Sequence, residues 1–156
     1  NKANLLGFNT PFLYFCTMRY LAFDMGSKRT GVAVTDPLGM FAQALTTLET
    51  PKVLPWLKNY LEQEKVKGLV LGFPLNHQGE ATDATALVLD TQKKIQSAFP
   101  NLPIFLEDEA FSSKQALNTL IQAGTSPKKR REKGLIDKVS AVHILQRFLQ
   151  NQTTAL

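Results

Sequence analysis

Short apolar runs separated by turn residues fill the part of the chain that follows residue 17. Arg19 to Asp24 is an apolar run that ends on a carboxylate, and Met25 to Gly31 holds two glycines and few apolar residues. Val32 to Val34 resumes the apolar pattern, and Phe41 to Leu48 follows after a segment with Pro and Gly. Runs bounded in this way are typical of strands joined by turns. The pattern predicts three strands in an antiparallel meander, with a turn over residues 25–31.

Helical spacing alternates with continuous apolar runs through the rest of the chain. Two runs, Gly68 to Phe73 and Ile104 to Leu106, are typical of buried strands. Helical spacing predicts helices from Pro51 through Leu61, from Ala81 to Ala98 and around Ala141 to Phe148. A further helix is predicted from Ser112 or Ser113 to a stop at Gly124, and it carries the apolar residues Ala116, Leu117, Leu120 and Ile121. Strands separated by helices pair in parallel through right-handed crossovers. The order predicts an α/β fold: a mixed five-stranded sheet, made of a three-stranded antiparallel meander and two parallel strands, with helices on both faces.

Residues 1–17 stand apart from this pattern. Met18 directly precedes the first predicted strand, and the apolar run from Leu5 to Cys16 is shorter than a membrane span. No small-x-small cleavage site of a secretory signal precedes Met18. We expect an N-terminal extension over 1–17, either an expression remnant or an unused upstream start, then a single domain over 18–150 and a tail over 151–156.

Composition narrows the class of protein and of partner. Eighteen Lys and Arg against thirteen Asp and Glu leave a net charge of +5, which suits a polyanion such as nucleic acid. Cys16 is the only cysteine, which excludes an intrachain disulfide. With two histidines, His77 and His143, it also leaves too few ligands for a zinc site of Cys and His alone. We expect a reducing, cytoplasmic location and no membrane partner.

Acids that are far apart in sequence stand at the ends of the predicted elements. Asp24 ends the first strand, Asp108 and Glu109 follow the last strand, and Asp137 opens the last helix on its core-facing stripe. Ligands of such sheets bind outside the carboxyl ends of the strands, so these carboxylates are expected at one edge. Taken singly, each acid is explained at least as well by turn chemistry, helix capping or a solvated edge.

Converging carboxylates repel one another and raise their pKa values unless cations lie among them. Hard oxygen ligands in a partly hydrated cleft suit Mg²⁺ or Mn²⁺. Two such ions can activate a water and stabilise the leaving oxygen in phosphodiester cleavage. The spacing of the acids therefore makes metal-dependent hydrolysis a hypothesis for this edge of the sheet.

Four segments, taken in order, carry motifs that cover Met18 to about Gln150. They are LAFDMGSKRTGVAVTD, LVLGFPLNHQGE, EDEAFSS and KGLIDKVSAVHILQRFL. The first resembles the strand, Asp-x-Gly turn and Gly-Val-Ala-Val strand that open members of the YqgF/RuvX family. The others are similar to its Val-Val-Gly-Leu-Pro-Leu-Asn, Asp-Glu-Arg-x-Ser-Thr and closing Ile-Asp helix segments. Members of this family are described as pre-16S rRNA nucleases and as Holliday-junction-resolvase-like proteins.

The resemblance implies an RNase H-like fold and a nuclease that uses Mg²⁺ or Mn²⁺, with two ions expected. It implies catalytic and metal-binding roles for Asp24, Glu109 and Asp137, with Asp108 as an additional candidate acid. Ala110 departs from the pattern, because the family commonly has Arg at this place. An Arg there could orient the carboxylates or meet a phosphate, so the departure removes one expected phosphate contact.

A basic run lies directly before Asp137. Residues 127–134 read PKKRREKG and set Lys128, Lys129, Arg130, Arg131 and Lys133 against Glu132. A flexible basic loop beside an acidic metal site could hold phosphates, although runs of like charge are also typical of solvated loops. Lys28 and Arg29 in the first turn either add phosphate contacts or are surface turn residues.

These features favour an endonuclease that hydrolyses phosphodiester bonds. The resemblance implies a role at the 5′ end of pre-16S rRNA in ribosome biogenesis, with structured rRNA precursors and ribosomal assembly particles as partners. A resolvase of branched DNA is the first alternative and needs a dimer, whereas the nuclease could be a monomer or a homodimer. A non-catalytic nucleic-acid-binding module is a further alternative. An actin- or sugar-kinase-like ATPase is disfavoured, because those enzymes close two such domains around the nucleotide.

Overall fold

The computed structural model describes residues 19–75, 78–108, 112–130, 132 and 134–154. The elements, in chain order, are β1 (Arg19–Met25), β2 (Arg29–Thr35), β3 (Ala42–Glu49), the short 3-10 helix η1 (Thr50–Lys52), α1 (Val53–Gln63), β4 (Val66–Phe73), α2 (Asp83–Ala98), β5 (Ile104–Asp108), α3 (Ser112–Gln122), α4 (Pro127–Arg130) and α5 (Leu135–Thr154). The strands form one five-stranded sheet in the order β3-β2-β1-β4-β5. β2 pairs antiparallel with β1 and β3, whereas β4 pairs parallel with β1 and β5. The predicted mixed sheet is confirmed.

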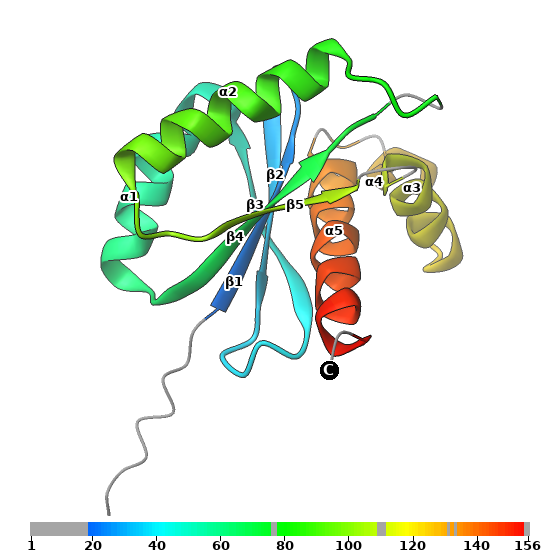
Figure 1. Ribbon diagram of the computed structural model, residues 1–156. Coiled ribbons are helices and arrows are strands. Elements are labelled where there is room, and N and C mark those ends of the chain that lie inside the picture. Colours follow the sequence, from blue (N-terminus) through cyan, green and yellow to red (C-terminus); the bar gives the residue numbers. More distant parts are fainter. Residues whose placement is uncertain (1–18, 76–77, 109–111, 131, 133, 155–156) are drawn as a thin grey trace, which may run out of the picture.

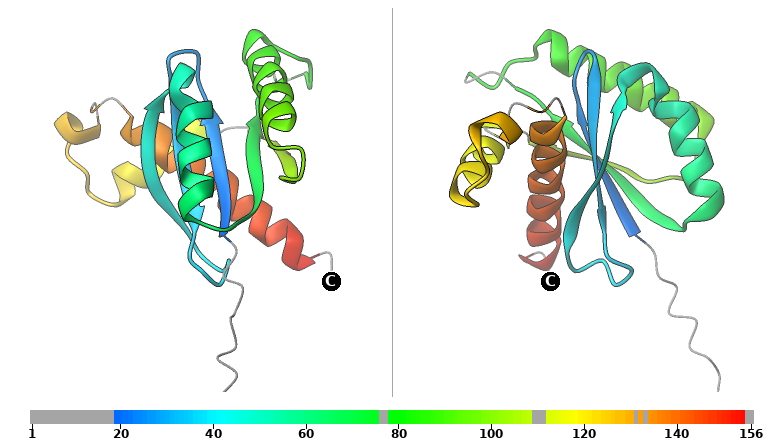
Figure 2. Two further views of the ribbon diagram at one scale, coloured as in Figure 1. Left: turned by 90° about the vertical axis from the view of Figure 1, so that its left-hand side faces the viewer. Right: turned by 180° about the vertical axis from the view of Figure 1, so that it is seen from behind.

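Helices cover both faces of the sheet (Figures 1 and 2). Successive residues of a strand point to opposite faces, so each strand supplies two cores. Phe23 of β1 belongs to the core that Leu57 of α1 and Ile95 of α2 complete, whereas Ala22 packs with Ile144 of α5. None of the helices in the described part of the chain is both long and apolar enough to cross a membrane. The face that α5 covers is the one that carries the candidate site.

The turn between β1 and β2 is shorter than the sequence indicates. The antiparallel ladder pairs Asp24 with Gly31 and leaves only residues 26–28 between the two strands. The predicted turn over 25–31 is therefore wrong at both ends, because backbone pairing with β1 does not require apolar side chains. As a result, Arg29 is the first residue of a strand and has a fixed place on the sheet.

β5 and α5 both extend further than the apolar residues that predicted them. β5 extends past Leu106 to Asp108, and α5 extends past Phe148 to Thr154. Glu107 is only 8% exposed and accepts a hydrogen bond from Asn151 Nδ2 at 3.0 Å. Arg147 Nε lies 3.6 Å from the same carboxylate. The contacts of Glu107 with Asn151 and Arg147 join the ends of β5 and α5. Glu107 is therefore a hydrogen-bonded, buried side chain and not part of a solvated edge.

Only part of the apolar face of α3 is covered. Ala116 and Leu120 are buried, but Leu117 is 39% and Ile121 is 49% exposed. Leu117 and Ile121 stay exposed because α3 packs on α5 and stands away from the sheet (Figure 1). α3 is followed by the predicted stop at Gly124, whose φ is 70°. The next segment, expected to be a loop, contains the short helix α4.

Candidate active site

The first turn of α5 lies directly against β2. A Cβ atom at Gly31 would stand 2.0 Å from the carbonyl oxygen of Asp137 and 2.3 Å from its carbonyl carbon. No larger residue fits there, so Gly31 is what allows the backbones of helix and strand to meet. Gly31 is also the ladder partner of Asp24. The contact therefore brings the start of α5 beside the carboxyl end of β1.

Gly134 and Thr47 hold the start of α5 from the side of β3. Gly134 has a φ of 95°, in the region that favours glycine, and a Cβ there would lie 3.0 Å from Thr47 Oγ1. Thr47 Oγ1 donates a hydrogen bond to the Gly134 carbonyl oxygen at 2.9 Å. The same oxygen accepts the backbone N–H of Lys138 at 3.1 Å. The first turn of α5 is thus positioned by two neighbouring strands.

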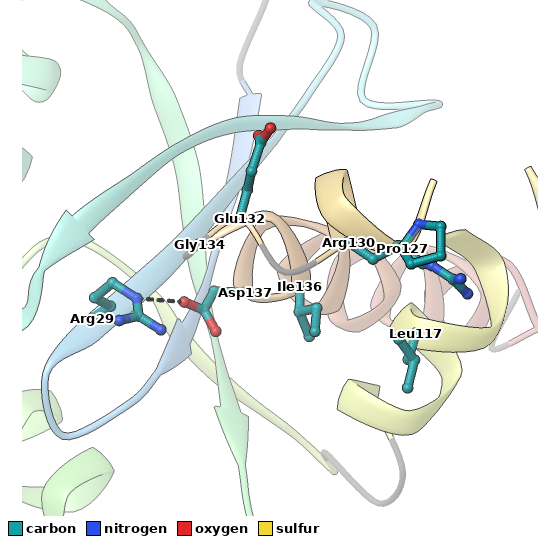
Figure 3. A pocket seen from close by; sticks show the side chains of 8 residues that line it. All are labelled: Arg29, Leu117, Pro127, Arg130, Glu132, Gly134, Ile136 and Asp137. Carbon is teal, nitrogen blue, oxygen red and sulfur yellow. Dashed lines mark hydrogen bonds and ion pairs between the residues drawn. The ribbon is translucent and has the colours of Figure 1, made fainter. Parts of the chain in front are cut away.

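Asp137 forms an ion pair with Arg29 (Figure 3). Arg29 Nε donates to Asp137 Oδ2 at 3.1 Å, and the pair is partly buried. Asp137 thus faces the sheet, as its place on the helix predicts. The guanidinium, for which the sequence left open a phosphate contact or a surface turn position, thus has a partner within the chain, and its contact with phosphate stays a prediction.

Asp24 shares the face of the sheet that α5 covers. Its alternate neighbour Ala22 packs with α5, whereas Phe23 belongs to the opposite core. The period of two along a strand directs Asp24 toward α5, and the residue is partly buried. Two of the candidate acids, Asp24 and Asp137, therefore lie at one edge of the sheet.

Asp108 points to the other face. It pairs with Phe73 in the parallel ladder, and Phe73 packs on the core beneath α1 and α2. Glu109 and Ala110 lie outside the described residues. Within the ranges that the structure describes, no three Asp, Glu, His or Cys residues form a group that could hold a metal ion. The described part of the edge thus offers the carboxylates of Asp24 and Asp137.

Candidate phosphate contacts lie on the segments that lead into this edge. Lys128 and Lys129 are exposed on α4, and Arg130 is partly buried. Lys28 is exposed in the turn before β2. Arg131, Lys133 and His77 lie outside the described residues. Positive side chains are therefore exposed on two segments next to this edge, the β1–β2 turn and α4, and Arg130 lines the same cavity as Asp137.

A cavity of about 490 Å³ opens beside the ion pair (Figure 3). Its lining includes Arg29 from β2, Leu117 from α3, Arg130 from α4, and Ile136 and Asp137 from α5. The apolar spacing of α3 did not predict this cavity, because such spacing does not tell which of the apolar residues stay uncovered. One feature of the sequence does point to it. The apolar face of α3 is broad, and one neighbouring helix, α5, can cover only part of that face.

The sheet order, the helices on both faces and the carboxylates at the strand edge define an RNase H-like α/β protein. T. thermophilus RuvC in complex with a Holliday junction substrate has this fold, with a TM-score of 0.53, 16% sequence identity, and coverage of 88% of this chain and 97% of that chain. The fowlpox virus Holliday junction resolvase matches with a TM-score of 0.54 and 11% identity, over 86% of this chain and 99% of that chain. At such identities the likeness is one of fold.

The sequence matches identify the family. The family model described as "RuvX: Holliday junction resolvase" matches residues 18–151. A Porphyromonas gingivalis protein is 44% identical over 133 residues, which cover 85% of this chain and 96% of the relative. A Christiangramia forsetii protein is 41% identical over 131 residues, or 84% and 97% of the two chains. Both relatives are named "Putative pre-16S rRNA nuclease". This chain belongs to the RuvX family of nucleases, as its motifs indicate.

Proposed function

We propose that this chain is a metal-dependent endonuclease that hydrolyses phosphodiester bonds near the 5′ end of pre-16S rRNA, in the cytoplasm. The observation that carries the proposal is the contact at Gly31, where the start of α5 meets the ladder partner of Asp24. Membership of the RuvX family supports nuclease chemistry. The names of the relatives support ribosomal RNA as the substrate.

The donor groups at this edge fit a hard divalent cation. Asp24 and Asp137 supply carboxylate oxygens, which Mg²⁺ and Mn²⁺ prefer over nitrogen or sulfur ligands. We assign the holding of such ions to Asp24, Asp137 and, from the sequence motif, Glu109. Bound ions would supply an activated water and stabilise the leaving oxygen of the phosphodiester. Asp108 is the less suitable acid, because it shares a face with Phe73.

Basic side chains balance the charge of these acids and attract the substrate. Arg29 offsets part of the charge of Asp137 through the 3.1 Å ion pair, and a divalent ion bound by Asp137 would take over this role and release Arg29 toward the substrate. Lys128 and Lys129 are exposed on α4, shortly before α5 begins, where they can contact the phosphate backbone without reading sequence. We therefore expect the RNA strand to cross the N-terminal end of α5, with one phosphodiester close to Asp24.

A cleavage assay tests the function. A structured RNA that carries the 5′ precursor sequence is incubated with the protein in Mg²⁺ or Mn²⁺. We expect Asp24→Asn to cut at least about 100-fold more slowly, because metal stabilisation of the developing charge amounts to several kcal/mol. Asp90→Asn, an exposed change on α2 that also removes one carboxylate, is the matched control and keeps the wild-type rate.

Two outcomes of this assay would contradict the proposal. Equal rates for Asp24→Asn and the wild type would remove Asp24 from the reaction. RNA binding that persists in EDTA, with no products in either metal, would instead favour a binding module without catalysis.

Branched DNA is the second candidate substrate. The description of the matching family model favours it, because that model is described as a Holliday junction resolvase. Cleavage of a four-way junction, compared with the RNA substrate at equal concentration, distinguishes the two. A resolvase acts on opposite strands and needs two sites, so a junction-dependent dimer in solution would also be expected.

A further inference from the structure

We propose that the cavity beside Asp137 binds one unpaired nucleotide of the substrate, next to the phosphodiester that is cut. The inference rests on the proposed function for the presence of a nucleic acid at this edge. It adds that the substrate is unpaired at the position that enters the cavity.

The cavity has the size and the place for such a ligand. Its volume of about 490 Å³ lies within the range of about 300–1,000 Å³ that small-molecule sites occupy. Arg29 and Asp137 line one part of it, so a bound group would directly adjoin one of the candidate acids, Asp137. α3, α4 and the start of α5 supply the remaining walls (Figure 3).

The lining combines apolar side chains with arginines. Leu117, Ile136 and Pro127 contribute apolar surface, and the side chains of Leu117 and Ile136 point into the same space in Figure 3. The faces of a nucleobase are apolar and its edges polar, so the flat base suits these walls. Unstacked bases in RNA are commonly bound between apolar, aromatic or guanidinium planes.

The arginines of the lining could contact phosphates of the bound strand. Arg29 and Arg130 line opposite ends of the cavity, with Ile136 between them, so the phosphates on the two sides of a bound nucleotide would run toward these two side chains (Figure 3). Lys128 and Lys129 extend the positive surface along α4. Glu132 also lines the cavity, but its side chain points away from Leu117 and Ile136 in Figure 3.

A base that is paired and stacked in a duplex cannot enter a cavity of this kind, because its faces are already covered. The protein should therefore prefer RNA with an unpaired nucleotide at the contact position over the same RNA fully paired. The exposed Leu117 is the wall that a base would cover, which explains why an apolar side chain lies open to solvent at this edge.

Binding in EDTA tests the inference without cleavage. Two hairpin RNAs of equal length are compared, one with a single unpaired 2-aminopurine nucleotide and one with that nucleotide paired. We expect the wild-type protein to bind the unpaired form about 10-fold or more tightly, since base stacking contributes roughly 1–3 kcal/mol. The fluorescence of 2-aminopurine should change on binding only in the unpaired RNA.

Matched variants on α3 locate the effect. Leu117→Glu puts a charged, solvated side chain where the base would meet the apolar wall, and it should abolish the preference for the unpaired RNA. Ile121→Glu makes the same change one helical turn away, at a more exposed apolar side chain that does not line the cavity, and it should keep the preference. Thermal melts of both variants confirm that the fold is retained.

The outcomes separate this inference from the proposed function. Equal binding of the two RNAs, or an unchanged preference in Leu117→Glu, would overturn the nucleotide site even if the wild type cleaves RNA. A preference that depends on Leu117 in a protein that never cleaves would support the site and overturn the proposed function.

Discussion

At Gly31 the absence of a side chain decides how close α5 comes to the sheet. The helix backbone at Asp137 occupies the space that a Cβ atom at residue 31 would need. Such a Cβ would lie only 2.0 Å from the carbonyl oxygen of Asp137. The ladder partner of Gly31 is Asp24, so one hydrogen atom controls the approach of two candidate catalytic residues. The geometry of the candidate site thus depends on Gly31, although this residue has no side chain that could take part in the reaction.

Gly31→Ala should displace the start of α5. We expect a loss of about 1–3 kcal/mol in the free energy of unfolding, as for overpacked cores, and a drop in cleavage of at least about 10-fold. Gly39→Ala is the comparison: its φ of 70° strains the backbone, but its Cβ meets no atom within 4 Å. That variant should lose stability and keep the cleavage rate of its folded fraction. Denaturant titration measures the stability of each variant, and a cleavage assay measures its rate. An equal loss of cleavage in both variants would contradict a special role of Gly31 in positioning α5.

Asp36 makes the hairpin between β2 and β3 sensitive to acid. Its carboxylate accepts backbone N–H groups of Phe41 and Met40 at 2.7 Å and of Leu38 at 3.1 Å. These bonds, first of all the one from Phe41, lower the pKa of Asp36 below its usual value. A lowered pKa means that the stabilisation is present above the ordinary aspartate pKa and is lost as pH falls through the folded-state value.

We therefore expect Asp36→Asn to lower the melting temperature at neutral pH and to change it little at pH 2. Melting curves measured across this pH range test the expectation. A constant difference between variant and wild type at every pH would contradict it.

At the scale of elements, α5 does more than cover a face of the sheet. Its first turn supplies Asp137, and its last turns hold β5 through the contact of Asn151 with Glu107 at 3.0 Å. β5 leads directly into the segment that contains Glu109. The same helix therefore fixes one candidate acid and the strand that precedes another.

Asn151→Ala tests the clamp between α5 and β5. Glu107 is 8% exposed and would lose its 3.0 Å donor while keeping the more distant Arg147. We expect a loss of about 1 kcal/mol in the free energy of unfolding. Gln152→Ala, at an exposed position next along the same helix, should change stability by less than about 0.5 kcal/mol. Equal losses from the two variants would argue against the clamp.

Local pattern was enough to predict the five strands, the four longer helices and the place of Asp24 near the end of β1, but not the short helix α4. The strand order follows from short antiparallel connections and helical crossovers, and the edge position of Asp24 follows from the end of its run. The sequence could not reveal the ion pair of Arg29 with Asp137, because 108 positions separate the two residues and no periodicity links them. It also could not tell that Leu117 is exposed, since that depends on how α5 packs against α3.

At the scale of the whole molecule, the net charge of +5 includes a basic segment next to the acidic edge. α4 carries Lys128 and Lys129, both exposed, shortly before the helix that supplies Asp137. Phosphate contacts release counterions, so affinity for RNA should fall linearly on logarithmic axes as salt rises. α4 is expected to supply part of that slope.

Replacing both Lys128 and Lys129 by Ala should reduce the salt slope by about 1.4, at roughly 0.7 for each phosphate contact of a single strand. Replacing Lys93 and Lys94 of α2 by Ala removes the same charge from a helix that covers the other face of the sheet and should leave the slope unchanged. RNA affinity measured at four or more salt concentrations gives the salt slope of each variant. Equal slopes for the two double variants would exclude α4 as the phosphate-binding segment.

The central claim is that Asp24 and Asp137, from opposite ends of the chain, bind the same divalent ion. The most direct measurement is anomalous diffraction from a crystal of the protein soaked in Mn²⁺. The account predicts a peak within about 2.2 Å of a carboxylate oxygen of each residue, with Arg29 turned away from Asp137. Carboxylates that point apart with no peak between them, at a Mn²⁺ concentration that supports cleavage, would contradict it.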